Sequence, residues 1–388
     1  MFIERGVTYI DGILAGGIRD GKYGVGVILA EKPLRAVGVF TKNRVKAAPV
    51  KLTSSMLNNG VECVVVNTGK ANAFTGKRGE EDCKRVIKKV ADVFSVSEDR
   101  VAIASTGVIG KRINLKLVEK LISKCKIGEG IKYDVAFANA IITTDRERKF
   151  FSLEKGIKIS CTEKGSGMIA PDLATMLAFI TTDAEIDHGF LDNVFTDCVE
   201  KTFNMISVDG HTSTNDTALI MANGLAGNPI IRPGTPEAFL FREALLELCR
   251  EMAKSIIKDG EGATKFVTIL VDKVDSFENA KKMAFGIANS ALVKSAFFGQ
   301  DPNWGRILSA AGMVGVTFDP DKADLKINDV FIYKTGNPLK PDKSVMSELM
   351  KPSELHILLT INTGDESATV YTTDLSYEYV KINAEYHT

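Results

Sequence analysis

The chain of 388 residues alternates between short apolar runs and longer stretches in which apolar residues recur every three or four positions. The short runs predict strands, and the periodic stretches predict amphipathic helices. In the first half we expect strands at 24–30, 36–41, 62–67 and 101–104, and helices near 80–93 and 115–124. This mixture predicts an α/β or α+β fold and lacks the regular repeat of a barrel.

The longest predicted helix covers residues 235–258. Thr235 is a suitable N-cap, Pro236 suits the first turn, and Gly260 ends the pattern. One face of this helix carries Phe241, Leu245, Leu248, Met252 and Ile256. Further helices are expected at 187–203, 278–294 and 344–350, strands at 266–271 and within 323–335, a polar turn at 336–342, and a strand pair at 356–362 and 368–372.

No low-complexity linker marks a domain boundary. With 45% hydrophobic residues the chain can bury one large core or two ordinary ones, and two domains are the default for this length. We place the boundary near residue 275, which gives a domain of residues 1–275 and a second, smaller α/β domain of residues 276–388.

Residues 164–177, Lys-Gly-Ser-Gly-Met-Ile-Ala-Pro-Asp-Leu-Ala-Thr-Met-Leu, interrupt the pattern of regular elements. Two glycines and Pro171 prevent residues 164–172 from forming a helix or a strand. Residues 175–182 then predict a buried strand, so Thr175 lies where a loop enters a strand. Most threonines at such positions simply suit β geometry, and position alone does not make this one functional.

Charge and composition exclude several classes of protein. The 49 basic and 49 acidic residues balance, and basic runs lie on amphipathic helical patterns, which argues against a nucleic-acid-binding protein. No apolar segment approaches the roughly 20 residues needed to cross a bilayer, and residues 1–5 resemble neither a signal nor a transit peptide. We therefore expect a cytoplasmic protein that has no membrane partner.

The cysteines and histidines do not predict a metal site. The cysteines are scattered without finger or redox spacing, and the histidines form no His-x-x-x-His pair. We expect reduced structural thiols and no bound metal. The residues concerned are Cys63, Cys83, Cys125, Cys161, Cys198, Cys249, His188, His211, His356 and His387.

Together with residues 164–177, several sequence blocks resemble the ornithine acetyltransferase family, the bifunctional glutamate N-acetyltransferases of arginine biosynthesis. The resemblance covers essentially the whole chain in order. Lys70, where an asparagine is common, is the clearest difference. The further blocks are 66–73 (VNTGKANA), 104–110 (ASTGVIG), 206–216 (ISVDGHTSTND), 259–265 (DGEGATK), 299–306 (GQDPNWGR) and 382–388 (INAEYHT).

The resemblance implies a self-processing fold with an N-terminal threonine nucleophile. Cleavage between Ala174 and Thr175 would leave an α chain, residues 1–174, and a β chain, residues 175–388. The freed α-amine of Thr175, with a reference pKa of about 8, would then be the base for its own hydroxyl. The family's oxyanion hole maps to Thr106 and Gly107.

The implied substrate site recognises the two charged ends of an amino acid. Lys164 and Glu261 carry opposite charges, and glycines on both sides of Glu261 let the backbone approach a ligand closely. Spacing does not decide between Thr143 and Thr144, although Thr143 is slightly favoured. The full set of implied substrate-binding residues is Thr143 or Thr144, Lys164, Thr175, Glu261, Asn383 and Thr388.

The implied reaction is ping-pong transfer of acetyl from N-acetylornithine to glutamate through an acetyl-threonine ester, without metal or nucleotide cofactor. Family members differ in whether they also use acetyl-CoA, and no residue here decides that co-substrate. The resemblance also implies an α2β2 heterotetramer of the protein's own chains.

Two alternatives remain open. A self-processing aminopeptidase or amidohydrolase would pass the acyl group to water, and an uncleaved protein would only bind amino acids. Some polar residues lie beside apolar runs and could shape the site, although structural turns are the commoner role for them. They are Asn67, Asn72, Asn204, Asp209, Asn215 and Asp216.

Overall fold

The computed structural model describes residues 1–170 and 176–385 and divides them into two compact units. Unit 1 comprises Met1–Asn204 and His211–Ile256, and unit 2 comprises Met205–Gly210 and the described residues 257–385. The division at Ile256 lies earlier than the boundary expected near residue 275. The reason is that β10 (Phe266–Val274) pairs with β14 (Glu354–Thr360) and β15 (Glu366–Thr373) inside unit 2.

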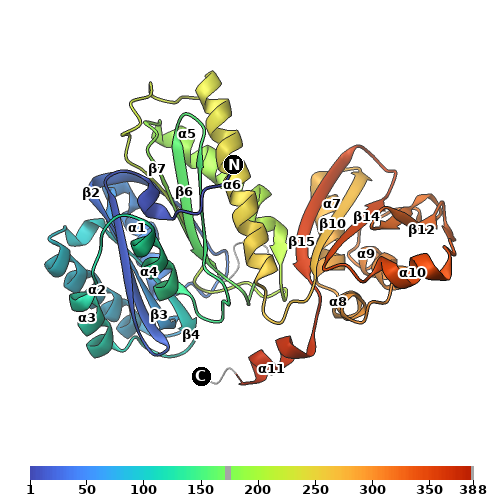
Figure 1. Cartoon of the computed structure of the whole chain (residues 1–388), viewed down its shortest axis with the longest axis horizontal. Coiled ribbons are helices and arrows are strands. Elements are labelled where there is room, and N and C mark those ends of the chain that lie inside the picture. Colours follow the sequence, from blue (N-terminus) through green and yellow to red (C-terminus); the bar gives the residue numbers. More distant parts are fainter. Residues whose placement is uncertain (171–175, 386–388) are drawn as a thin grey trace. The chain divides into compact units, whose positions relative to one another are not determined.

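Unit 1 is built on an eight-stranded sheet in the order β4-β3-β2-β9-β7-β6-β5, with β1 beside β2 (Figure 1). Strands β3 and β4 are parallel, as are β7 and β9, and the other pairs are antiparallel. The strands are β1 (Ile13–Asp20), β2 (Tyr23–Phe40), β3 (Val61–Lys70), β4 (Val101–Val108), β5 (Lys149–Glu154), β6 (Lys158–Lys164), β7 (Leu177–Thr182) and β9 (Thr217–Ala222).

Helices pack on both faces of the β3–β4 part of this sheet. Val65 and Ile103 contact the apolar side of α2 and α3, whereas Val66 and Ala104 belong to the core on the other face, with Phe137 of α4. Alternating residues of a strand point to opposite faces, which accounts for this division. The helices of unit 1 are α1 (Ala48–Met56), α2 (Gly76–Phe94), α3 (Leu115–Lys124), α4 (Ile131–Ile141), α5 (His188–Lys201) and α6 (Pro236–Lys258), the last reaching the boundary.

The predicted helix at 235–258 is confirmed as α6. The Thr235 hydroxyl accepts a hydrogen bond from the Ala238 amide at 3.2 Å, and Pro236 is the first helical residue. All five residues of the predicted apolar face are fully buried. The helix therefore forms where its capping residue and its apolar stripe predict it.

The two strands expected at 24–30 and 36–41 are one strand, β2. Its first half pairs with β1 and β3 and its second half with β9, and the register with β3 shifts between Leu29 and Leu34. Pro33 lies in that shift, where its missing N–H costs no ladder hydrogen bond. Residues 31–33, Glu-Lys-Pro, are exposed, so the sequence looks interrupted although the strand continues.

Unit 2 contains a seven-stranded sheet in the order β13-β12-β11-β14-β10-β15-β8. The strands expected at 356–362 and 368–372 are present as β14 and β15, but they are not neighbours, because β10 lies between them. The predicted helix at 278–294 is two helices, since Asn289 ends the first and Ser290 caps the second. The remaining elements are β8 (Ile206–Ser207), α7 (Phe277–Ala288), α8 (Ala291–Phe298), α9 (Trp304–Gly312), β11 (Asp324–Ile327), β12 (Val330–Lys334), β13 (Asn337–Pro338), α10 (Lys343–Leu349) and α11 (Tyr377–Glu385).

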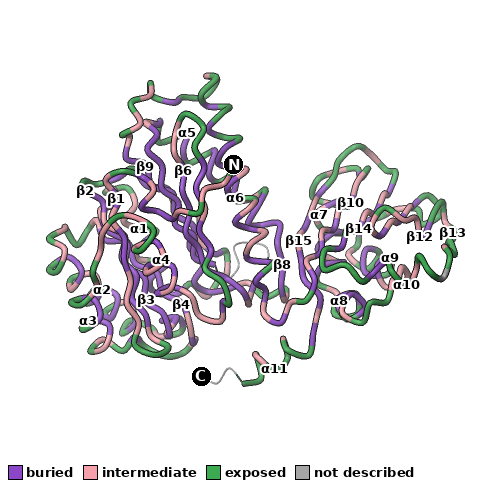
Figure 2. The backbone as a smooth tube through the Cα atoms, viewed as in Figure 1, coloured by how far each residue is buried: buried purple, intermediate pink, exposed green. Residues whose placement is uncertain are grey.

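Burial follows the sheets (Figure 2). Every residue of β7 and of β9 is buried, whereas the edge strand β13 is exposed. All six cysteines are free thiols, and five of them are buried. No helix in the described part of the chain is long and apolar enough to cross a membrane. Among the same residues no group of histidine, cysteine, aspartate and glutamate is arranged to hold a metal ion.

Candidate active site

A group of buried polar side chains lies where β6 ends. Lys164 is the last residue of β6 and pairs with Leu177, the first residue of β7. The segment between them contains the predicted cleavage junction. Gly165 follows with a φ of 159°, which any residue adopts, but Met168 has a φ of 56°, an uncommon value for a residue with a side chain. The chain therefore leaves β6 through an irregular turn.

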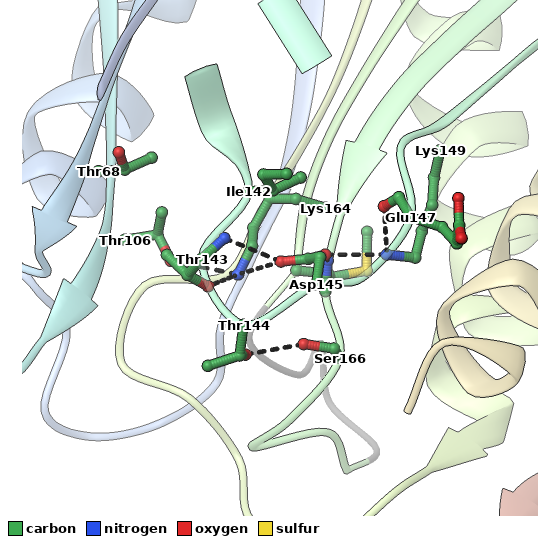
Figure 3. Close-up of polar contacts among 12 residues, drawn as sticks. Thr68, Thr106, Ile142, Thr143, Thr144, Asp145, Glu147, Lys149, Lys164 and Ser166 are labelled. Carbon is green, nitrogen blue, oxygen red and sulfur yellow. Dashed lines mark hydrogen bonds and ion pairs between the residues drawn. The ribbon is translucent and has the colours of Figure 1, made fainter. Parts of the chain in front are cut away.

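The Lys164 side chain is buried and connects three segments that are distant in sequence (Figure 3). Its ammonium group donates a hydrogen bond to the Thr143 hydroxyl at 2.8 Å and makes a longer contact of 3.4 Å with the Thr106 hydroxyl. The neighbouring Thr144 hydroxyl is paired instead with that of Ser166, at 2.8 Å. Lys164 thus joins the end of β6 to the end of β4 and to the segment after α4.

Asp145 supplies the opposite charge. Its side chain is fully buried and lies 2.9 Å from the Lys149 ammonium group and 3.6 Å from that of Lys164. It also accepts hydrogen bonds from the backbone amides of Gly165, at 2.6 Å, and Thr143, at 3.0 Å. Burial raises the pKa of this carboxyl, but the two ammonium groups and the hydrogen bonds outweigh it, so its pKa lies well below the ordinary range. Asp145 is therefore ionised.

Thr106 and Gly107 lie near the end of β4, just before its last residue, Val108, and beside the parallel strand β3. Gly107 has a φ of 124°, and a Cβ there would lie 2.4 Å from the Gly69 carbonyl carbon, so only glycine fits. Ser105, the residue before Thr106, is fixed by its hydroxyl, which donates a hydrogen bond to the Asn67 side-chain oxygen at 2.5 Å. The Asn215 amide donates to the Ser105 carbonyl at 2.9 Å. The backbone at the Thr-Gly pair is therefore held from two sides.

Asp216 is fully buried beside Met176, the residue before β7. One of its carboxylate oxygens accepts the backbone amide of Met176 at 3.2 Å, and the other has no hydrogen-bond partner among the described residues. Burial raises the pKa of this carboxyl well above its ordinary value, although nearby donors and Lys164 offset part of the effect. An acidic group therefore contacts the residue that follows Thr175 in sequence.

Unit 2 holds a second polar group. Glu261 follows α6 in the sequence Asp-Gly-Glu-Gly, and its carboxylate accepts a hydrogen bond from the Asn383 side chain at 2.9 Å. Asn383 lies on α11 and also donates to the Tyr379 carbonyl at 3.0 Å. Gly262 has a φ of 67°, and a Cβ there would lie 2.3 Å from the Tyr379 amide nitrogen, so this glycine lets α11 approach the loop.

The family model described as the ArgJ family matches residues 11–388. This chain belongs to the ArgJ family. It is 44% identical to a Methanocaldococcus jannaschii protein named glutamate N-acetyltransferase, over 100% of this chain and 99% of that protein. It is 43% identical to a Geobacter sulfurreducens protein named arginine biosynthesis bifunctional protein ArgJ, over 95% of this chain and 96% of that protein.

A solved structure of the bifunctional ArgJ protein from Bacillus halodurans matches with a TM-score of 0.53 and 38% identity, covering 54% of this chain and 99% of that chain. The family prediction and the mixed α/β fold class are both confirmed.

In this ArgJ-family chain the structure brings together some of the predicted site residues. Thr106, Gly107, Thr143 and Lys164 lie near one another in unit 1, and Glu261 contacts Asn383 in unit 2. Lys164 contacts Thr143, whereas Thr144 contacts Ser166, and the slight preference for Thr143 as the substrate contact stays a prediction. Ala174, Thr175 and Thr388 lie outside the described residues.

Sequence reasoning did not single out Asp145 and Lys149. They belong to the charged run Asp-Arg-Glu-Arg-Lys at 145–149, a pattern typical of a solvated loop. The structure buries only the two ends of this run. The one available signal was that the run begins with an acid and ends with a base four positions later, directly before the apolar pair Phe150 and Phe151.

Proposed function

We propose that this ArgJ-family chain transfers the acetyl group of N-acetylornithine to glutamate, giving ornithine and N-acetylglutamate. The observation that carries the proposal is the similarity, over the whole chain, to a relative named glutamate N-acetyltransferase. By the family resemblance, Lys164 and Glu261 are the charged residues that recognise the amino acid substrate. The proposed reaction needs no metal or nucleotide cofactor, because one amide is exchanged for another.

The nucleophile in this proposal is Thr175, released as an N-terminus by cleavage after Ala174. Thr106 and Gly107 form the oxyanion hole, a role for which the fixed backbone at the end of β4 is suited, because preorganised donors need no rearrangement during the reaction. Lys164 and Thr143 bind one end of the substrate. Glu261 and Asn383, together with Thr388, bind the end of the substrate that carries the charged amino group.

In the first half-reaction the Thr175 hydroxyl attacks the acetyl carbonyl of N-acetylornithine. Its proton passes to the Thr175 α-amine and from there to the departing amine of ornithine, which leaves an acetyl ester on Thr175. In the second half-reaction the amine of glutamate attacks this ester. The same α-amine accepts the proton from that amine and returns one to the Thr175 oxygen, so the enzyme is regenerated.

The solved Bacillus halodurans chain has the length expected of one product of this cleavage. It matches over nearly its whole length yet covers 54% of this chain. That share is close to the part of the sequence from Thr175 to Thr388. A separate chain of this length is expected if family members are cut before the threonine.

Initial-rate kinetics test the proposal. Varying N-acetylornithine and glutamate together should give parallel double-reciprocal lines, because the first product leaves before the second substrate reacts. Intersecting lines would contradict the acetyl-threonine intermediate. Consumption of N-acetylornithine without glutamate would instead favour the alternative function, a self-processing aminopeptidase or amidohydrolase.

Two finer features of the proposal have separate assays. Similar relatives carry the name glutamate N-acetyltransferase or that of the bifunctional ArgJ protein at almost the same identity. Glutamate-dependent release of thiol from acetyl-CoA therefore decides whether acetyl-CoA is a second donor. Light scattering of the native protein tests the α2β2 assembly, for which a mass of two α and two β chains is expected.

A further inference from the structure

Lys294, on α8, places an ammonium group deep inside unit 2, where the residue is only 4% exposed. The group donates hydrogen bonds to the Thr372 hydroxyl at 3.1 Å, to the Thr373 hydroxyl at 3.0 Å and to the Thr373 carbonyl oxygen. These acceptors match its three protons. None of them is a carboxylate, and burial lowers the pKa of Lys294 to about 7, while Asp374 and Asp209 oppose that change. A lysine in this place is costly and calls for a local reason.

The residue after Thr373 connects Lys294 to the Glu261 loop. The carboxylate of Asp374 accepts the backbone amides of Thr264, at 2.9 Å, and Lys265, at 3.0 Å, and also the Thr264 hydroxyl. Thr264 follows Glu261 by three positions. The end of β15, which Lys294 holds, therefore fixes the chain on one side of Glu261.

The same segment also fixes the start of α11. The Leu375 amide donates to the Lys294 carbonyl at 3.2 Å, and the Ser376 hydroxyl donates to the Gly262 carbonyl at 2.6 Å. That hydroxyl in turn accepts the Tyr379 amide at 3.3 Å, as a helix cap does. Asn383 lies one turn further along this helix and contacts Glu261.

Glu261 and Asn383 thus both depend on residues 373–376, and Lys294 anchors this segment through its ammonium group and its carbonyl. We propose that Lys294 is a positioning residue that holds the Glu261–Asn383 pair in the geometry that binds the amino acid substrate. This inference rests on the proposed function, because it takes this pair as part of the substrate site. Lys294 itself does not touch the reacting atoms in this account.

Lys265 provides a matched control in the same unit. It is buried to a similar degree, and its ammonium group also has three oxygen acceptors, the carbonyls of Met350, Lys351 and Pro352 at the end of α10. Its ammonium group holds residues 350–352, between α10 and β14, whereas its contact with Asp374 is made by the backbone amide, which a side-chain substitution keeps. Replacing it removes a comparable set of hydrogen bonds and leaves the support of Glu261 in place.

The test compares steady-state acetyl transfer by the full-length wild type, Lys294→Met and Lys265→Met. For Lys294→Met we expect KM for glutamate and for N-acetylornithine to rise about ten-fold or more, with kcat changed by less than about three-fold, because binding rather than chemistry is lost. For Lys265→Met both KM values should stay within about two-fold of the wild type. A purely structural role for Lys294 would not separate the two variants in this way.

Unchanged KM values in Lys294→Met, or an equal rise in Lys265→Met, would overturn the inference. If Lys294→Met does not fold, Thr373→Val removes one of its acceptors and should raise KM in the same direction, whereas Thr369→Val on the same strand should not. A Thr373→Val protein with wild-type KM would then overturn it. A wild-type protein that never acetylates glutamate contradicts the proposed function instead, so the two failures are distinguishable.

Discussion

Glu163 lies beside Lys164 in β6, and its carboxyl group is fully buried. One oxygen accepts the Ser255 hydroxyl at 3.0 Å, and the other has no hydrogen-bond partner in the described part of the chain. Burial raises the pKa of Glu163 to about 8, and the nearby Lys149 offsets only part of this change. At neutral pH Glu163 is therefore mostly protonated, while Asp145 carries the negative charge beside the two lysines.

This raised pKa predicts a pH-dependent difference in stability between the wild type and Glu163→Gln. The folded pKa of about 8 lies above the ordinary value of 4.5, so the contribution of Glu163 is fully present below about pH 4.5 and is lost as the pH rises through 8. Glutamine keeps the Ser255 contact but cannot ionise. We therefore expect the stability advantage of Glu163→Gln over the wild type to grow as the pH rises from about 5 to about 9. The difference in free energy of unfolding should reach up to several kcal/mol, and the melting temperature of the variant should rise relative to that of the wild type.

Calorimetric scans across this pH range measure the difference directly. Glu119→Gln is the control, because Glu119 forms a partly exposed ion pair with Arg85 at 2.9 Å, and such pairs contribute about 0–1 kcal/mol. A difference between Glu163→Gln and the wild type that does not change with pH would show that Glu163 titrates normally.

Among the elements, β4 has a position near its end that only glycine can occupy. Gly107 and Gly110 both have positive φ, at 124° and 78°. A Cβ on Gly107 would overlap the backbone of β3, whereas a Cβ on Gly110 meets no atom within 4 Å. Gly107→Ala must therefore displace the strand end that carries the proposed oxyanion donors.

We predict that Gly107→Ala lowers kcat by about a hundred- to a thousand-fold, the usual effect of losing one oxyanion donor. Gly110→Ala should lower the free energy of unfolding by about 1–2 kcal/mol, because alanine is strained at positive φ. It should keep kcat within a few-fold of the wild type. Measuring kcat and the free energy of unfolding for both variants separates the two effects. Similar activity in the two proteins would remove Gly107 from the proposed mechanism.

Elements with strong local signals could be predicted from the sequence. Helices α3 and α6 begin and end within a residue of their predicted limits, because periodic apolar residues and a capping threonine mark α6, and periodicity alone marks α3. The continuity of β2 could not be predicted, because the exposed residues 31–33 resemble a loop, although both halves of the strand are paired with neighbouring strands. The placement of β10 between β14 and β15 depends on long-range pairing, which local pattern does not encode.

The site shows the same division. The Thr106–Gly107 motif and Lys164 could be found from sequence blocks, and the structure places them together. Asp145 could not be found in this way, because a buried aspartate and a solvated one look alike in sequence. Only the approach of two lysines in the structure shows that this aspartate is buried and paired.

At the scale of the whole molecule, cleavage after Ala174 would leave two chains that share one sheet. Strands β9 and β7, which follow the junction, lie between β2 and β6, which precede it. Each of these strand contacts is an unbroken ladder of five or more paired positions. The two chains should therefore remain associated after cleavage, because separating them would expose buried strand edges.

We predict that the two chains elute together in size-exclusion chromatography under native conditions and separate only in denaturant. The uncut Thr175→Ala variant is the control and should elute at the same position as the wild type. Release of either chain from a cut wild-type sample without denaturant would show that this sheet does not hold the two chains together.

The central claim is that Thr175 becomes an N-terminal nucleophile that carries acetyl between two amino acids. Its most direct test is the intact mass of the denatured protein, with and without prior incubation with N-acetylornithine. We predict two chains that divide between Ala174 and Thr175, and, after incubation, one acetyl group added to the chain that begins at Thr175, with neither change in Thr175→Ala. A folded wild-type protein that stays in one piece, or a cut one that never gains the acetyl group, would contradict the account.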